Sequence, residues 1–298
     1  MAHATALPSF DIWAALAQSL VWHRYCKRLD ARLAETAGTP YLCVVCEHAT
    51  RLQRLSEGLV AFSTTGVQDE VFWFLRPCFE VFASQCVLQF GNVPHPSNRE
   101  MTKDEKAEAY RLHADCFQLQ LLQNHENWPG HTHALVTLRA EIARLKANLA
   151  NHPYSLRWDR PWHGMALAPA IKAALKARNA AFGANPLEQQ IAEAFAIMKD
   201  HCNAGIHGNS YAARFLRGPA TPAGSPITDD RTPRGHPNWV LAGYLATLSL
   251  EMLAEEFGER SLVSAMSLSA QKDLENNPYR YVRHFPTATI ELIPSDRR

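Results

Sequence analysis

Polar side chains that could bind a phosphate or the edge of a base gather in one segment, HCNAGIHGNSYAARF, residues 201–215. Asn203 and His207 are four residues apart, so on a helix they lie on the same face. Ser210 and Arg214 follow in the same segment and are further candidate binding residues. The cluster is interpreted either as a binding site or as the polar cap of a helix that ends before Gly208.

A charged pair, Arg76 and Glu80, interrupts an otherwise apolar stretch, GVQDEVFWFLRPCFEVFASQCVLQF. The two residues are four apart and would share a helix face. Because buried charges need partners, we expect either an ion pair between helices or a pocket lined by both residues. We also expect His207 and Asn203 to lie on an inward helix face near this pair. These four residues are therefore the candidate catalytic residues.

No metal or cofactor site is predicted. The segment CVVCEH, residues 43–48, has one pair of cysteines beside a histidine, without the second pair of a zinc ribbon. HENWPGHTH, residues 125–133, has three histidines but no His-Glu-x-x-His. Glycine-rich phosphate loops are also absent from the sequence.

The elements that position these residues are predicted to be helices, because apolar side chains recur at spacings of three and four along most of the chain. Nine helices are predicted, over residues 12–38, 41–62, 66–92, 102–125, 132–152, 165–183, 185–207, 236–258 and 261–275. The segment 66–92 is apolar almost all round, so we expect a central helix with Trp73, Phe74, Phe79 and Phe82 buried. The sequence predicts an all-α bundle of about eight to ten helices, with a short extended tail at residues 287–294.

The domain organisation is predicted to be a single helical domain over residues 1–298. A Pro- and Trp-rich connector at residues 151–163 marks a possible soft boundary, and residues 219–237 form a long loop by composition.

Composition restricts the partners and the location. The chain has 30 basic and 29 acidic residues, without the basic excess that is usual in dedicated nucleic-acid-binding proteins. It has no long apolar run that could span a membrane and no predicted secretory signal. The chain has seven cysteines, several of them inside helical patterns, and we expect these to be reduced thiols. We expect a cytoplasmic protein that does not bind membranes.

The segment CNAGIHG resembles the Arg-Asn-x-x-x-His-Gly signature of HEPN domains, helical bundles of which many are RNases in toxin and anti-phage systems. Asn203, His207 and Gly208 match the signature, and Cys202 stands where the HEPN nucleases have their catalytic arginine. The chain is also similar, over roughly residues 50–220, to uncharacterised bacterial helical proteins. The resemblance implies a HEPN-like helical core, and the loss of the arginine implies at best weak RNase activity.

Three functions are consistent with these patterns. The first is a non-catalytic interaction or regulatory protein with a degenerate HEPN-type core, in a bacterial defence or toxin-related system, with a protein partner or as a homodimer. The alternative is a HEPN-like RNase or a protein that binds RNA or a nucleotide. The third is a small-molecule enzyme that uses Arg76, Glu80 and His207.

Overall fold

The computed structural model of the chain describes residues 10–35, 38–64, 71–126, 135–182 and 237–276. These residues contain eight helices and no strand, and 79% of them are helical, which confirms the prediction of an all-α protein. The predicted helix 185–207 and the predicted tail 287–294 lie outside the described residues. The total number of helices and the HEPN-like core therefore stay predictions.

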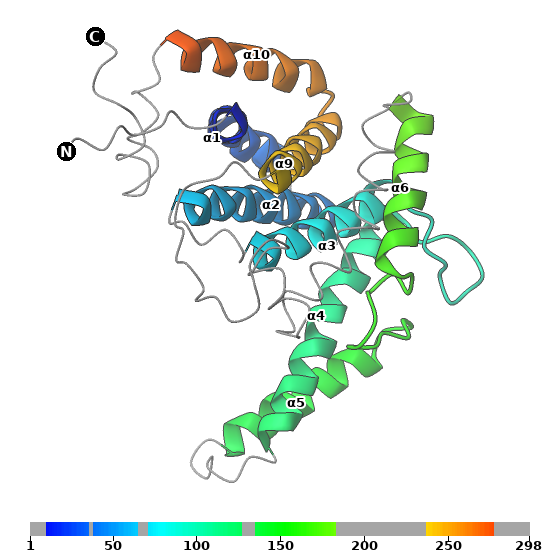
Figure 1. Cartoon of the computed structure of the whole chain (residues 1–298). Coiled ribbons are helices and arrows are strands. Elements are labelled where there is room, and N and C mark those ends of the chain that lie inside the picture. Colours follow the sequence, from blue (N-terminus) through cyan, green and yellow to red (C-terminus); the bar gives the residue numbers. More distant parts are fainter. Residues whose placement is uncertain (1–9, 36–37, 65–70, 127–134, 183–236, 277–298) are drawn as a thin grey trace, which may run out of the picture. The chain divides into compact units, whose positions relative to one another are not determined.

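The helices begin and end close to the predicted positions (Figure 1). They are α1 (Phe10–Glu35), α2 (Pro40–Thr64), α3 (Val71–Phe90), α4 (Lys103–Glu126), α5 (Leu135–Ala150), α6 (Leu167–Phe182), α9 (Pro237–Glu255) and α10 (Arg260–Asn276). In the described ranges, no helix has both the length and the apolar character that a bilayer span requires.

Two compact units make up the chain. The first consists of residues 1–37, 46–85 and 186–298, and the second of residues 38–45 and 86–185, so that α2 and α3 contribute to both. The connector 151–163 lies wholly inside the second unit. Of the predicted loop 219–237, all but the last residue lies outside the described residues. The single-domain interpretation stays a prediction.

The core of the first unit includes α3, as its apolar sequence predicts. Phe79 and Phe82 are 1% and 0% exposed, which confirms their predicted burial. The side chains of Trp73 and Phe74 lie outside the described residues. A buried polar contact joins α3 to α9: the Gln85 amide donates to Ser249 O at 3.0 Å, and the Ser249 hydroxyl donates back to Gln85 Oε1.

In the same unit α1 packs against both α9 and α10 (Figure 1). Gly258 makes the turn between α9 and α10, with a left-handed φ of 66° that a glycine adopts without strain. The N–H groups of Gly258 and Glu259 donate to Glu255 O and Ala254 O, the two hydrogen bonds of a Schellman motif. The Glu259 carbonyl then accepts the first hydrogen bonds of α10, from Leu262 and Val263.

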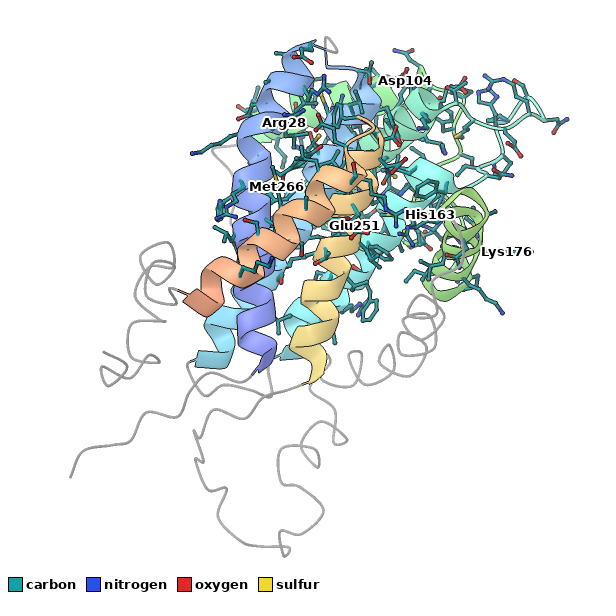
Figure 2. The ribbon with its side chains drawn as sticks, turned by 90° about the horizontal axis from the view of Figure 1, so that it is seen from above. Arg28, Asp104, His163, Lys176, Glu251 and Met266 are labelled. Carbon is teal, nitrogen blue, oxygen red and sulfur yellow. The ribbon has the colours of Figure 1, made fainter. Side chains whose placement is uncertain are left out.

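The side chain of Glu259 ties this turn to α1. Tyr25, Arg28 and Arg32 are spaced so that they share one face of α1. The Arg28 and Arg32 Nε atoms donate to Glu259 Oε1 at 2.8 and 2.9 Å, and the Tyr25 hydroxyl donates to Oε2 at 3.1 Å (Arg28 is labelled in Figure 2). These bonds, that of Arg28 above all, lower the pKa of Glu259 to about 2.

Glu259→Gln is expected to lower the free energy of unfolding by about 2 kcal/mol, because the buried side chain loses its charge-assisted hydrogen bonds. Urea denaturation measures the loss, and Glu255→Gln, on the last residue of α9, is the matched control. Glu259 holds a pKa below its usual 4.5, so its contribution is complete above pH 4.5 and is lost as the pH falls toward 2. Equal losses in both variants would contradict this role.

In the second unit a buried lysine joins α4 to the end of α3. Lys106 is 5% exposed, and its ammonium donates to Val87 O at 3.3 Å and Gly91 O at 3.0 Å. These carbonyls lie at the negative end of the α3 dipole, where a cation is stabilised. A Cβ on Gly91 would come within 2.8 Å of the Val87 backbone, so only glycine fits at this position.

The connector between α5 and α6 is also held against α4. His113 Nε2 lies 3.1 Å from Arg157 O and 2.7 Å from Arg160 O, and the Tyr110 ring meets the edge of the buried Trp162 ring. His163, labelled in Figure 2, is 6% exposed, and its Nδ1 accepts a hydrogen bond from Met165 N at 3.2 Å. Burial, with a smaller contribution from His113, lowers the pKa of His163 to about 4.

The neutral state of His163 makes the fold sensitive to acid. The pKa of His163 in the folded protein lies below the usual 6.5, so this histidine binds a proton at a higher pH in the unfolded chain than in the folded one. The free energy of unfolding therefore falls as the pH decreases from 6.5 toward 4. The shift corresponds to roughly 3 kcal/mol. We expect His163→Gln to flatten the dependence of the unfolding free energy on pH in this range. An unchanged pH dependence in the variant would contradict this role of His163.

Candidate binding cleft

A cleft of about 420 Å³ opens in the second unit, along the first half of α4. Most of its lining comes from α4, and the rest from the start of α2, the end of α5 and the connector. The lining residues are Pro40, Asp104, Glu105, Glu108, Arg111, Leu112, Asp115, Asn148 and His152. Asp104 is labelled in Figure 2. The lining contains four carboxylates and one arginine, so the cleft is acidic.

The helical period explains this concentration of charge. Asp104, Glu108, Arg111 and Asp115 are separated by four, three and four residues, so they form one stripe along α4. The buried Lys106 lies on the opposite side of the helix. Anchoring Lys106 at the end of α3 therefore turns the charged stripe outward.

The first turn of α4 is fixed by a capping box. The Glu105 N–H donates to Thr102 Oγ1 at 3.3 Å, and the Thr102 N–H donates to Glu105 Oε2 at 2.8 Å. Arg99 adds a bidentate ion pair, with Nη1 at 2.7 Å from Glu105 Oε2 and Nη2 close to Oε1. The hydrogen bonds from Arg99 and Thr102 lower the pKa of Glu105 to about 2. Glu105 is therefore ionised and occupied by structural partners.

Asp104 links α4 to the start of α2. Thr39 and Pro40 suit the cap and first position of a helix, and Thr39 Oγ1 accepts from the Leu42 N–H at 3.3 Å. Asp104 Oδ1 accepts from the Tyr41 N–H at 3.3 Å, and the Lys103 ammonium lies 4.8 Å from the centre of the Tyr41 ring. The Asp104 carboxylate therefore lies at the positive end of the α2 dipole, which favours negative charge.

Glu108 lies beside an aromatic cluster from the connector. The Tyr154 hydroxyl donates to Glu108 Oε2 at 3.0 Å, and His152 Nδ1 lies 3.5 Å from Oε1. The His152 and Tyr154 rings stack with centroids 6.3 Å apart, and His95 meets Tyr154 edge-on. Burial and the hydrogen bond to Glu108 raise the pKa of Tyr154 to about 12, so this phenol stays protonated and acts as a donor.

Asp115 closes the far end of the stripe. Asn148 on α5 donates to Asp115 Oδ2 at 2.7 Å, which also links the two helices. As far as the described residues show, Asp104, Glu108 and Asp115 each use part of their acceptor capacity within the fold. The remaining oxygen lone pairs can accept hydrogen bonds from a ligand.

The chemistry of the cleft favours a cationic organic group. Carboxylates held by fixed donors bind an ammonium or a guanidinium through charge-assisted hydrogen bonds. Within the described ranges, no three His, Cys, Asp or Glu side chains come together as a metal ion would require. A phosphate would meet a surplus of negative charge in this cleft.

The structure corrects the expectation of a buried pair at Arg76 and Glu80. The pair forms within α3, with Arg76 Nε 2.9 Å from Glu80 Oε1, and the side chains are 37% and 47% exposed. The expectation that both charges are buried was therefore wrong. In the folded chain Phe79 and Phe82 are buried, while the Arg76 and Glu80 side chains reach solvent.

The other predicted site residues lie outside the described residues: Cys202, Asn203, His207, Ser210 and Arg214. The expected approach of His207 to the Arg76–Glu80 pair therefore stays a prediction.

The cleft was not predicted, although the sequence contains a signal for its charged stripe. Charged residues at spacings of four, three and four, after a Thr-x-x-Glu capping box, predict a charged stripe near the start of a helix. The partners from α5 and the connector, Asn148 and His152, have no comparable signal because their positions depend on tertiary packing.

Comparison with protein-family models, curated proteins and solved structures finds no match to this chain. The resemblance to HEPN domains accordingly stays a prediction.

Thr102→Ala is expected to destabilise the fold by about 1 kcal/mol, because the first turn of α4 loses its cap. Thr137→Ala, on an exposed position of α5, is the matched control and should change little. Thermal denaturation followed by circular dichroism compares the two. A Thr102 variant as stable as the control would show that the capping box does not hold the acidic end of α4.

Proposed function

We propose that the protein is a non-catalytic helical interaction protein that binds a basic segment of a protein partner in the acidic cleft. A degenerate HEPN-type core, with Cys202 in place of the nuclease arginine, and a role in a bacterial defence or toxin-related system belong to the same proposal. The observation that carries it is the surplus of four carboxylate side chains over the single Arg111 in the lining of a cleft of about 420 Å³.

The arrangement of the carboxylates supports binding more than catalysis. Each of Asp104, Glu108 and Asp115 is held by a donor from another segment, so the cleft is organised before a ligand arrives. Tyr154 has a raised pKa of about 12, which makes its phenol a poor nucleophile or base. A lysine or arginine side chain would fit between these acceptors.

The two other functions receive less support. A cleft with surplus negative charge disfavours RNA, and the RNase alternative depends on Asn203 and His207, which lie outside the described residues. The enzyme that would use Arg76, Glu80 and His207 loses its main argument, because the Arg76–Glu80 pair is exposed and paired within one helix.

Binding of a fluorescein-labelled Arg-Gly repeat peptide, followed by anisotropy, tests the proposal. We expect Glu108→Gln and Asp115→Asn each to weaken binding about fivefold, the effect of one partly exposed ion pair, and salt to weaken it further. Glu141→Gln removes a carboxylate of α5 that pairs with Arg144 outside the cleft and is the matched control.

Two outcomes would contradict the proposed function. The first is an absence of binding by the correctly folded protein. The second is an equal loss of affinity in the Glu141 control, which would show that the peptide responds only to overall charge.

A further inference from the structure

A hydrogen-bonded turn at residues 157–160, RWDR, belongs to the same unit as the cleft and displays basic and aromatic side chains. His113 Nε2 contacts Arg157 O and Arg160 O, and because both partners are carbonyl oxygens, the histidine nitrogen is the donor. The Arg160 N–H donates to Arg157 O across the turn at 3.2 Å. The backbone on both sides of Trp158 is therefore held against α4.

The side chains of this turn point away from the fold. Trp158 is 50% exposed, although a tryptophan gains most from burial. Arg157 and Asp159 neutralise each other through two hydrogen bonds of 2.9 and 2.8 Å. The exposed Arg160 guanidinium makes no hydrogen bond or ion pair within the described part of the chain. With two arginines and one aspartate, the turn carries a net positive charge.

Tryptophan and arginine are the residue types that most often anchor protein interfaces. An interface anchor is most effective when its backbone is already fixed, because less conformational entropy is lost on binding. The turn has a tryptophan and arginines on a backbone that is held in place, and its charge is opposite to that of the cleft. The two surfaces use different residues, with the turn at 157–160 and the cleft mainly on α4.

We propose that the turn 157–160 of one chain binds in the acidic cleft of a second copy, with Arg160 among the carboxylates and Trp158 against the rim. The inference rests on the proposed function, since it names a second copy of this chain as the source of the basic group. Because each copy offers one turn and one cleft, the contact is heterologous and builds rings or open chains instead of closed dimers.

Sedimentation velocity over a range of protein concentrations tests this contact with two double variants. Trp158→Ala/Arg160→Ala removes the turn, and Glu108→Gln/Asp115→Asn neutralises the cleft. We expect the unmodified protein to form larger species as its concentration rises and each double variant alone to remain monomeric. Mixed together, the two variants should form a 1:1 dimer and nothing larger, because one intact turn then meets one intact cleft.

Controls make the outcome specific. Lys146→Ala removes an exposed charge from α5 and should associate like the unmodified protein, and circular dichroism checks that every variant is folded. A folded unmodified protein that stays monomeric, or double variants that fail to form the mixed dimer, would overturn the proposal. If the Arg-Gly peptide still binds in that case, the cleft takes a basic partner other than this chain, and the proposed function stands.

Discussion

The second unit depends on one buried charge, the ammonium of Lys106. An ion removed from water costs several kcal/mol unless it is well compensated. Lys106 meets this need with the carbonyls of Val87 and Gly91, at the C-terminal end of α3. This contact sets the rotation of α4 about its own axis. The acidic stripe from Asp104 to Asp115 must then face outward, where the cleft forms.

The residues that line the cleft also hold the fold together. Asp104 caps α2, Glu105 caps α4 and Asp115 ties α4 to α5. Each carboxylate accepts a hydrogen bond that also holds the local structure in place. Concentrated like charge would otherwise destabilise the unit, so these structural bonds are what allow an acidic cleft to exist before a cation is bound.

In the first unit a buried charge is again compensated by hydrogen bonds, and here the buried charge is negative. Glu259 is a buried carboxylate at the turn between α9 and α10, and Tyr25, Arg28 and Arg32 of α1 donate to it. The arginines keep part of their surface in water, so the ion pair stabilises the turn without burying two full charges. Gln85 and Ser249 satisfy each other in the same way inside the core.

The sequence by itself determined the helices, because their apolar period, Thr39–Pro40 and the Thr102 capping box are local signals. It also predicted the burial of Phe79 and Phe82. Only the tertiary structure decided that Arg76 and Glu80 lie outside the core, since the same spacing suits a buried or an exposed face. The closure of the cleft by α5 and the connector was likewise decided by the tertiary structure. Asn148 and His152 reach Asp115 and Glu108 across separations of 33 and 44 residues, and no local pattern encodes such contacts.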